Sequence, residues 1–110
     1  MQVVVYGILI PMSDIHDLTV RIGRMTKSLD HTSDPKIILL FLMEELGEVA
    51  RAYLKEQGHK KSNDRVTETF REELGDVFYL ILRLAAVTNT DLEKELNKTE
   101  KKLTRNKPLL

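Results

Sequence analysis

A hexapeptide that occurs twice constrains this chain more than any other feature. The first copy is Glu-Glu-Leu-Gly-Glu-Val at positions 44–49, and the second is Glu-Glu-Leu-Gly-Asp-Val at positions 72–77. The two copies differ only where one carboxylate replaces another. Apolar residues flank both copies at spacings of three and four, which is the period of an amphipathic helix. Each copy is therefore expected inside a helix, with two carboxylates one turn apart on a shared face.

Length and composition place these helices in one small globular domain. The chain has 110 residues, of which 42% are hydrophobic and 31% charged, as is typical of a folded domain. Its 17 basic and 17 acidic residues cancel, so no bulk charge favours a nucleic acid polymer or an anionic membrane. The absence of cysteine excludes disulfides, thiolate metal sites and cysteine nucleophiles. We expect a cytoplasmic protein.

An apolar run precedes the expected helices. Residues 2–10 are rich in β-branched side chains, which favour strands. The run is too short for a transmembrane helix, which needs about 20 residues. It also lacks the basic start and the small-residue cleavage site of a signal peptide. We expect residues 1–12 to form a separate apolar segment, which is either a strand that pairs across an oligomer or a poorly specified tail.

Boundary signals divide the remaining helical domain, residues 13–108, into four expected helices. The first is capped by Ser13 or Asp14 and runs to about Leu29. A weaker fourth helix begins at a capping box of Thr90 and Glu93. The two longest helices are expected over residues 35–57, between Asp34-Pro35 and Gly58, and over residues 64–88, after a cap at Asn63 or Asp64.

The apolar positions of these helices predict a bundle. The first and third helices carry stripes at Ile15, Leu18, Ile22, Met25 and Leu29, and at Val66, Phe70, Leu74, Val77, Ile81 and Leu84. The first half of the second helix, Ile37 to Met43, is apolar on every side and must be covered on every side. A second subunit is expected to give part of that cover. The expected fold is all-α, a four-helix-type bundle assembled into a homodimer or homotetramer.

Four carboxylates of the two hexapeptides form the candidate site. Glu45 and Glu48, like Glu73 and Asp76, stand one turn apart beside the apolar stripe of their helix. Antiparallel packing of the two helices would bring the pairs face to face, where repulsion and lost solvation call for a cation. Oxygen ligands without cysteine favour Mg²⁺, with Mn²⁺ as a substitute. One copy alone would be read as helix surface with ion pairs, but two copies beside the core favour a metal site.

The spacing Glu45-x-x-Glu48 and Glu73-x-x-Asp76 resembles the ExxE…ExxD signature of MazG-like nucleoside triphosphate pyrophosphohydrolases. The resemblance extends over residues 37–88 and includes Glu-Glu-Leu-Gly-Asp-Val-Phe-Tyr-Leu. It implies an all-α fold, obligate oligomerisation and Mg²⁺-dependent cleavage of NTP or dNTP between the α- and β-phosphates. The products would be a nucleoside monophosphate and pyrophosphate, as in house-cleaning of the nucleotide pool. The four carboxylates would be the catalytic metal ligands.

The C-terminal segment departs from the family pattern. Many members have an asparagine and an Arg-Tyr-Pro triplet, whereas Arg105-Asn106-Lys107-Pro108 keeps the basic character and the proline without the aromatic residue. The candidate contacts to substrate phosphates are Lys98, Lys101, Lys102 and Arg105. The alternatives to an enzyme are a helical interaction module, or a nucleotide or metal sensor without turnover. Release of pyrophosphate and monophosphate from a nucleotide would separate the enzyme from both.

Overall fold

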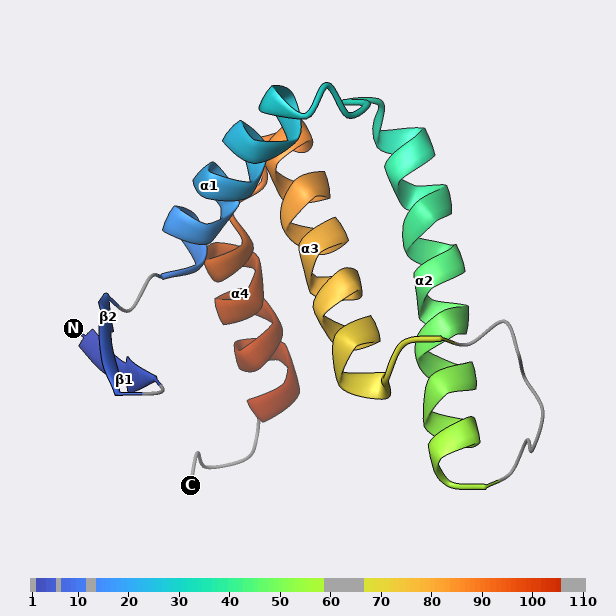
Figure 1. The fold of residues 1–110 in the computed structure, drawn as a ribbon. Coiled ribbons are helices and arrows are strands. Elements are labelled where there is room, and N and C mark those ends of the chain that lie inside the picture. The colour runs from blue at the N-terminus through green and yellow to red at the C-terminus, as the bar shows by residue number, and fades with distance from the viewer. Residues whose placement is uncertain (1, 6, 12–13, 59–66, 106–110) are drawn as a thin grey trace.

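The computed structural model describes residues 2–5, 7–11, 14–58 and 67–105. Within these residues the chain forms two strands, β1 (Gln2–Val5) and β2 (Ile8–Pro11), followed by four helices. The helices are α1 (Ile15–Ser28), α2 (Pro35–Glu56), α3 (Phe70–Thr88) and α4 (Leu92–Thr104) (Figure 1). The prediction of an all-α domain with each hexapeptide inside a long helix is confirmed.

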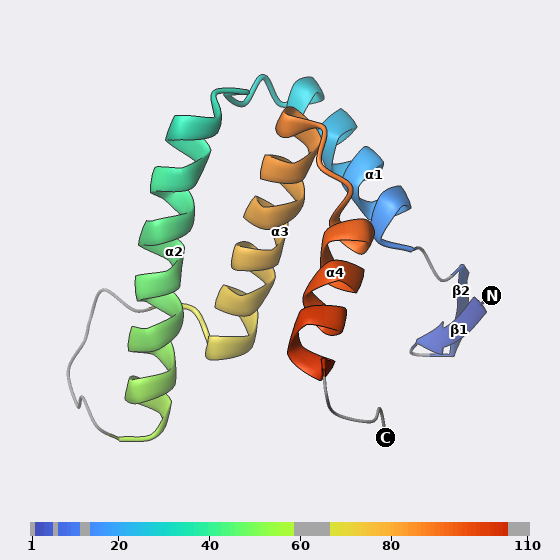
Figure 2. The same cartoon turned by 180° about the vertical axis from the view of Figure 1, so that it is seen from behind.

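Helix α3 occupies the centre of the molecule. It packs against α2 on one side and against α1 on the other, while α4 contacts α1. In both views α3 stands between α2 and α4, and α2 and α3 run antiparallel (Figures 1 and 2). The two helices that carry the hexapeptides are therefore direct neighbours.

Capping interactions fix the first three helix starts. Asp14 accepts a hydrogen bond from the Asp17 backbone nitrogen at 2.7 Å, and α2 begins with Pro35 after its cap Asp34. Helix α3 begins at Phe70, where Thr69 and Glu72 form a reciprocal capping box. The predicted start at residue 64 is wrong, because residues 67–69 are not helical. The caps proposed for that start, Asn63 and Asp64, and the alternative α1 cap, Ser13, lie outside the described residues.

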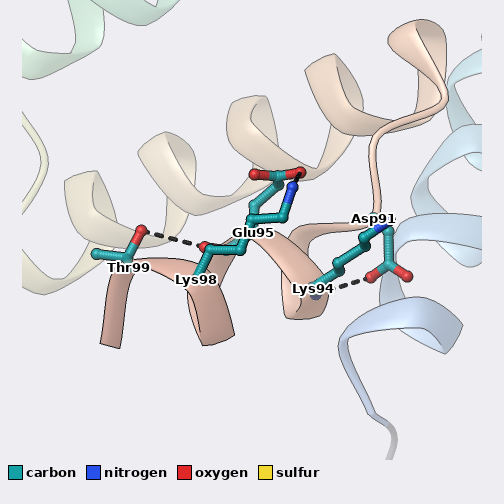
Figure 3. Close-up of polar contacts among 5 residues, drawn as sticks. All are labelled: Asp91, Lys94, Glu95, Lys98 and Thr99. Carbon is teal, nitrogen blue, oxygen red and sulfur yellow. Dashed lines mark hydrogen bonds and ion pairs between the residues drawn. The ribbon is translucent and has the colours of Figure 1, made fainter. Parts of the chain in front are cut away.

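The start of α4 also differs from the prediction. Its N-cap is Asp91, whose side chain accepts a hydrogen bond from the Lys94 backbone nitrogen at 3.0 Å (Figure 3). Thr90 instead belongs to the end of α3, because its backbone nitrogen donates to the Ala85 carbonyl at 2.9 Å. Asn89 adopts a left-handed conformation there, with a φ of 53°. The predicted capping box of Thr90 with Glu93 is therefore wrong.

The N-terminal apolar run pairs with itself. β1 and β2 are antiparallel, in a register that runs from Gln2 opposite Pro11 to Val5 opposite Ile8. Gly7 lies in the connection with a φ of +76°, which is strained for residues with a Cβ atom. The run therefore forms a hairpin within the chain, where a single strand or a poorly specified tail was expected, since each half of the run supplies backbone partners to the other. Pairing across an oligomer stays a prediction. The expected domain division falls at Met12 and Ser13, outside the described residues, and stays a prediction.

Among the residues whose burial the structure describes, the buried apolar core is small and lies along α2 and α3. Its members are Ile38, Ala52, Val77, Leu80, Leu82 and Ala85. Two of the predicted stripes are partly wrong, because Leu74 is 45% exposed and Leu29 is 53% exposed. Helix α3 is covered from two sides, so its buried residues do not follow one narrow stripe. Val66 lies outside the described residues. None of the described helices has the length and apolarity needed to cross a membrane.

Candidate metal centre

Three of the predicted carboxylates meet between α2 and α3. Glu45 on α2 and Glu73 and Asp76 on α3 each offer one oxygen, and these three oxygens lie within 4.8 Å of one another. The spacing of three residues places Glu73 and Asp76 on one face of α3. The packing of α2 against α3 then brings Glu45 to the same place. The repeated hexapeptide thus supplies one cluster from two helices.

The fourth predicted ligand, Glu48, is not part of this cluster. Its Oε1 accepts a hydrogen bond from Nη2 of Arg51, three residues further along α2. The two side chains are 26% and 38% exposed. An ion pair of this kind is worth at most about 1 kcal/mol, so another cation could replace Arg51 at little cost.

Glu73 is the buried member of the cluster. It is 4% exposed, and its Oε2 has no hydrogen-bond partner among the described residues. Burial, a hydrogen bond with the Glu45 carboxyl and the negative charge of the neighbouring carboxylates raise the pKa of Glu73 from 4.5 to about 7. A buried oxygen that lacks a partner, set among like charges, fits a site for a cation.

Glu68 is a further carboxylate that the sequence analysis missed. A hydrogen bond with the Asp76 carboxyl, together with the charge of Asp76, raises the pKa of this exposed side chain. In one continuous helix from residue 64, Glu68 and Asp76 would be about 12 Å apart along the axis. They meet because α3 begins only at Phe70. The sequence signal that could have found this position is the capping box of Thr69 and Glu72.

A pocket of about 330 Å³ opens beside the cluster. It is lined by Phe41, Glu44, Glu45, Asp76, Tyr79 and Leu80. Apolar and aromatic walls with a few convergent charged groups are typical of small-molecule sites. A larger hollow of about 790 Å³ lies between α1 and the C-terminal part of α3, but none of the three clustered carboxylates lines it. The candidate site is therefore the smaller pocket.

The four candidate phosphate contacts lie on another part of the molecule. Lys98 donates a hydrogen bond to Glu95 at 3.2 Å, on α4 itself (Figure 3). Lys101, Lys102 and Arg105 are exposed at the end of the same helix. Because α4 lies beyond α3 from α2 (Figures 1 and 2), a single chain does not gather these side chains at the carboxylates. Their contact with phosphate stays a prediction, and Asn106, Lys107 and Pro108 lie outside the described residues.

The donor set fits a hard divalent cation. Carboxylate oxygens are the protein ligands that Mg²⁺ and Mn²⁺ prefer, and a Mg²⁺ ion held by a few of them usually keeps positions for water and substrate phosphates. Among the described residues, the ion pairs join Arg51 to Glu48 and Lys98 to Glu95, and neither includes a member of the cluster. The cluster therefore has the composition to bind a metal.

The fold and the site define a class of all-α proteins with a cluster of carboxylates that could bind a metal ion, and comparison with known proteins narrows this class. Residues 33–110 match the MazG nucleotide pyrophosphohydrolase domain. The chain belongs to this family, and it is a hydrolase that acts on nucleotide pyrophosphate bonds. The resemblance stated from the two hexapeptides is thereby confirmed.

Two solved structures are similar over most of their length. One is a candidate pyrophosphatase, YPJD from Bacillus subtilis, with 24% identity and a TM-score of 0.75 over 87% of this chain and 98% of that chain. The other is the Bacillus-conserved MazG protein, a nucleotide pyrophosphohydrolase, with 25% identity and a TM-score of 0.69 over 86% and 93%. The comparison with curated proteins gives no match.

Proposed function

We propose that this chain is a Mg²⁺-dependent nucleoside triphosphate pyrophosphohydrolase, for which Mn²⁺ can substitute. It would cleave NTP or dNTP between the α- and β-phosphates and release a nucleoside monophosphate and pyrophosphate. The observation that carries the proposal is the cluster of Glu45, Glu73 and Asp76, with three oxygens within 4.8 Å at the edge of a pocket. Membership of the MazG family supports the same reaction.

The three clustered carboxylates are the proposed metal ligands, and Glu48 is the proposed fourth. Glu48 stands one turn beyond Glu45 on α2, so it would have to exchange Arg51 for the ion. A divalent cation bound there would offset the charge of the carboxylates and the triphosphate and, as a Lewis acid, polarise a phosphoryl oxygen.

The pocket suggests how the chain would orient a nucleotide. Its acidic end would receive the triphosphate through the cation, and its aromatic end, Phe41 and Tyr79, would receive the base or sugar. Water would attack in line at phosphorus as the bond to the leaving pyrophosphate breaks. A carboxylate that uses one oxygen as a ligand keeps the other to accept the proton of that water.

The test is product analysis with a panel of ribo- and deoxyribonucleoside triphosphates. We expect equal amounts of monophosphate and pyrophosphate with Mg²⁺ or Mn²⁺ and none with a chelator. Diphosphate with inorganic phosphate would contradict the site of cleavage. Unchanged nucleotide throughout would favour a binding module or sensor. The matched control for a cluster variant is Glu100→Gln, which changes an exposed carboxylate on α4.

We also propose that the active protein is a homodimer or homotetramer. Exposed apolar side chains gather on the first half of α2 at Ile37, Leu39, Leu40, Phe41 and Met43. Within this stretch only Ile38 is buried by the chain itself. Large exposed apolar surfaces mark protein contacts, and a second copy of the same chain is the commonest partner.

A further inference from the structure

Arg83 is a buried arginine without a carboxylate partner in the described part of the chain. It lies on α3 and is 4% exposed. Its Nη2 donates a hydrogen bond to the Thr32 carbonyl at 2.8 Å, and its Nε has no partner among the described residues. The guanidinium carbon lies 5.9 Å from the centre of the Phe41 ring.

Filling space does not account for this arginine. A buried charge without an opposite charge loses solvation, and an unbranched apolar side chain of similar length would occupy the same volume without that loss. A planar guanidinium can donate to a carbonyl in its plane while its face covers an aromatic ring, which an ammonium group does poorly. Arg83 makes both contacts, one to Thr32 and one to Phe41.

One of these contacts reaches the candidate pocket directly, and the other holds the connection that leads into α2 and lines the larger hollow. Thr32 lies in the connection between α1 and α2, and Phe41 on α2 is one of the pocket's aromatic walls. Tyr79, the other aromatic wall, is one turn before Arg83 on α3, and its hydroxyl lies 3.4 Å from Nδ1 of His31. Two successive turns of α3 therefore hold the same connection. Arg83 itself does not line the pocket.

We propose that Arg83 is a positioning residue that fixes Phe41 and the connection before α2, so that the pocket beside the carboxylates keeps its shape for the nucleotide. Arg83 acts through Thr32 and Phe41 and touches neither the cation nor the phosphates. The inference rests on the proposed function for its effect on substrate. Its structural part, the hold on residues 29–41, is independent of turnover.

The central variant is Arg83→Met, which keeps the length of the side chain and removes the charge and the donors. We expect KM for the best nucleotide to rise about tenfold, because the variant loses one charged hydrogen bond and one cation–π contact. The kcat value should stay within about twofold of wild type. Mn²⁺ affinity, measured without nucleotide, should not change. Arg83→Lys should recover part of KM, because it restores the charge and one donor. Arg21→Met, an exposed arginine on α1, is the matched control and should match wild type.

Hydrogen–deuterium exchange supplies a readout that needs no turnover. In Arg83→Met we expect faster exchange in residues 29–41, with residues 44–49 and 72–77 unchanged. Unchanged exchange in residues 29–41 would overturn the proposal, whether or not the protein hydrolyses nucleotides. A loss of Mn²⁺ binding, or a fall in kcat at constant KM, would also overturn it, since either would place Arg83 at the metal.

Two further variants keep the test decisive if Arg83→Met does not fold, as judged by far-ultraviolet circular dichroism. Arg83→Lys and Phe41→Leu each weaken the contact between guanidinium and ring while leaving an apolar or charged side chain in place. Both should raise KM without changing Mn²⁺ affinity. Because Phe41 also lines the pocket, the proposal fails if Arg83→Lys leaves KM at the wild-type value. If wild type turns over no nucleotide, the proposed function fails alone, and exchange in Arg83→Lys decides the role of Arg83.

Discussion

At the proposed metal site, Glu73 would link proton binding to metal binding. Its carboxyl is buried beside Glu45 and Asp76, so without a cation it holds a proton up to a pKa of about 7. A metal ion needs the deprotonated ligand, so the ion and the proton compete for the same oxygens. Metal affinity should therefore weaken as the pH falls below about 7, in a range where an ordinary glutamate would stay ionised.

The raised pKa of Glu73 predicts the pH dependence of stability in the metal-free protein. The folded state binds the proton more tightly than the unfolded state, so stability falls as the pH rises from 4.5 to about 7. Glu73→Gln removes this contribution and should flatten the fall in Tm over that range. Thermal melts in chelator measure it, with Glu100→Gln as the control. Parallel wild-type and Glu73→Gln curves would contradict the assignment.

Asp76→Asn should show whether the cluster is a metal site or an ordinary acidic surface. The amide removes a ligand and a like charge together, so turnover should fall by about 100-fold or more while metal-free Tm stays level or rises. Mg²⁺ with a non-hydrolysable nucleotide should raise the wild-type Tm and not that of the variant. A surface carboxylate would show neither effect. Wild-type turnover in Asp76→Asn would move the site elsewhere.

Glu48→Gln decides whether the ion pair with Arg51 is exchanged for the metal. If Glu48 is the fourth ligand, the turnover rate of Glu48→Gln should fall nearly as far as that of Asp76→Asn. Breaking the ion pair alone would change the free energy of unfolding by at most about 1 kcal/mol. Turnover at the wild-type rate would restrict the ligands to the three carboxylates that the structure brings together.

At the scale of elements, the start of α3 shapes the site. The capping box of Thr69 and Glu72 ends the preceding segment just where Glu68 meets Asp76. Thr69→Ala should therefore lower the free energy of unfolding by about 1 kcal/mol, the usual value of an N-cap. Urea unfolding measures the change, and Thr67→Ala, two residues earlier and exposed, is the control. Equal losses in the two variants would show that the cap is not what stabilises this helix.

The sequence predicted those parts of the fold that local patterns determine. Helical spacing and the repeated hexapeptide placed Glu45, Glu73 and Asp76 on neighbouring helices, and Gly58 marked the end of α2 correctly. Features that depend on packing were not predictable in this way. Leu74 is exposed while Glu73 is buried, because the face of α3 that packs against α2 carries Glu73 and not Leu74.

Other features depended on which partner a polar group finds in the folded chain. Thr90 closes α3 rather than beginning α4, because its backbone nitrogen is taken by Ala85. Glu48 has the spacing of a ligand, but its carboxylate forms an ion pair with Arg51, three residues further along the same helix. Arg83 carries no motif, and its role follows only from the carbonyl and the ring that the fold places beside it.

At the scale of the whole molecule, the balance of buried and exposed apolar surface is unusual for a chain of this size. Within the described residues the buried apolar core is six side chains, while 14 large hydrophobic residues are exposed. Leu46, Leu74 and Phe78 extend the exposed surface of α2 and α3 beyond the first half of α2. This balance supports the proposal that another copy of the chain covers the exposed surface.

Leu40→Lys tests whether a second copy supplies that cover. Leu40 is 64% exposed in the single chain, so in a monomer the change should alter stability by no more than about 0.5 kcal/mol. In an oligomer it would place a charge inside an apolar contact, and the assembly should dissociate or lose helicity. Light scattering on wild type should give a multiple of 12.7 kDa and a lower mass for the variant. Leu103→Lys on α4, with 70% exposure, is the control and should keep the wild-type mass. A wild-type mass of one chain at micromolar concentration, with helicity intact, would mean that this apolar surface stays open, and the proposed assembly would be wrong.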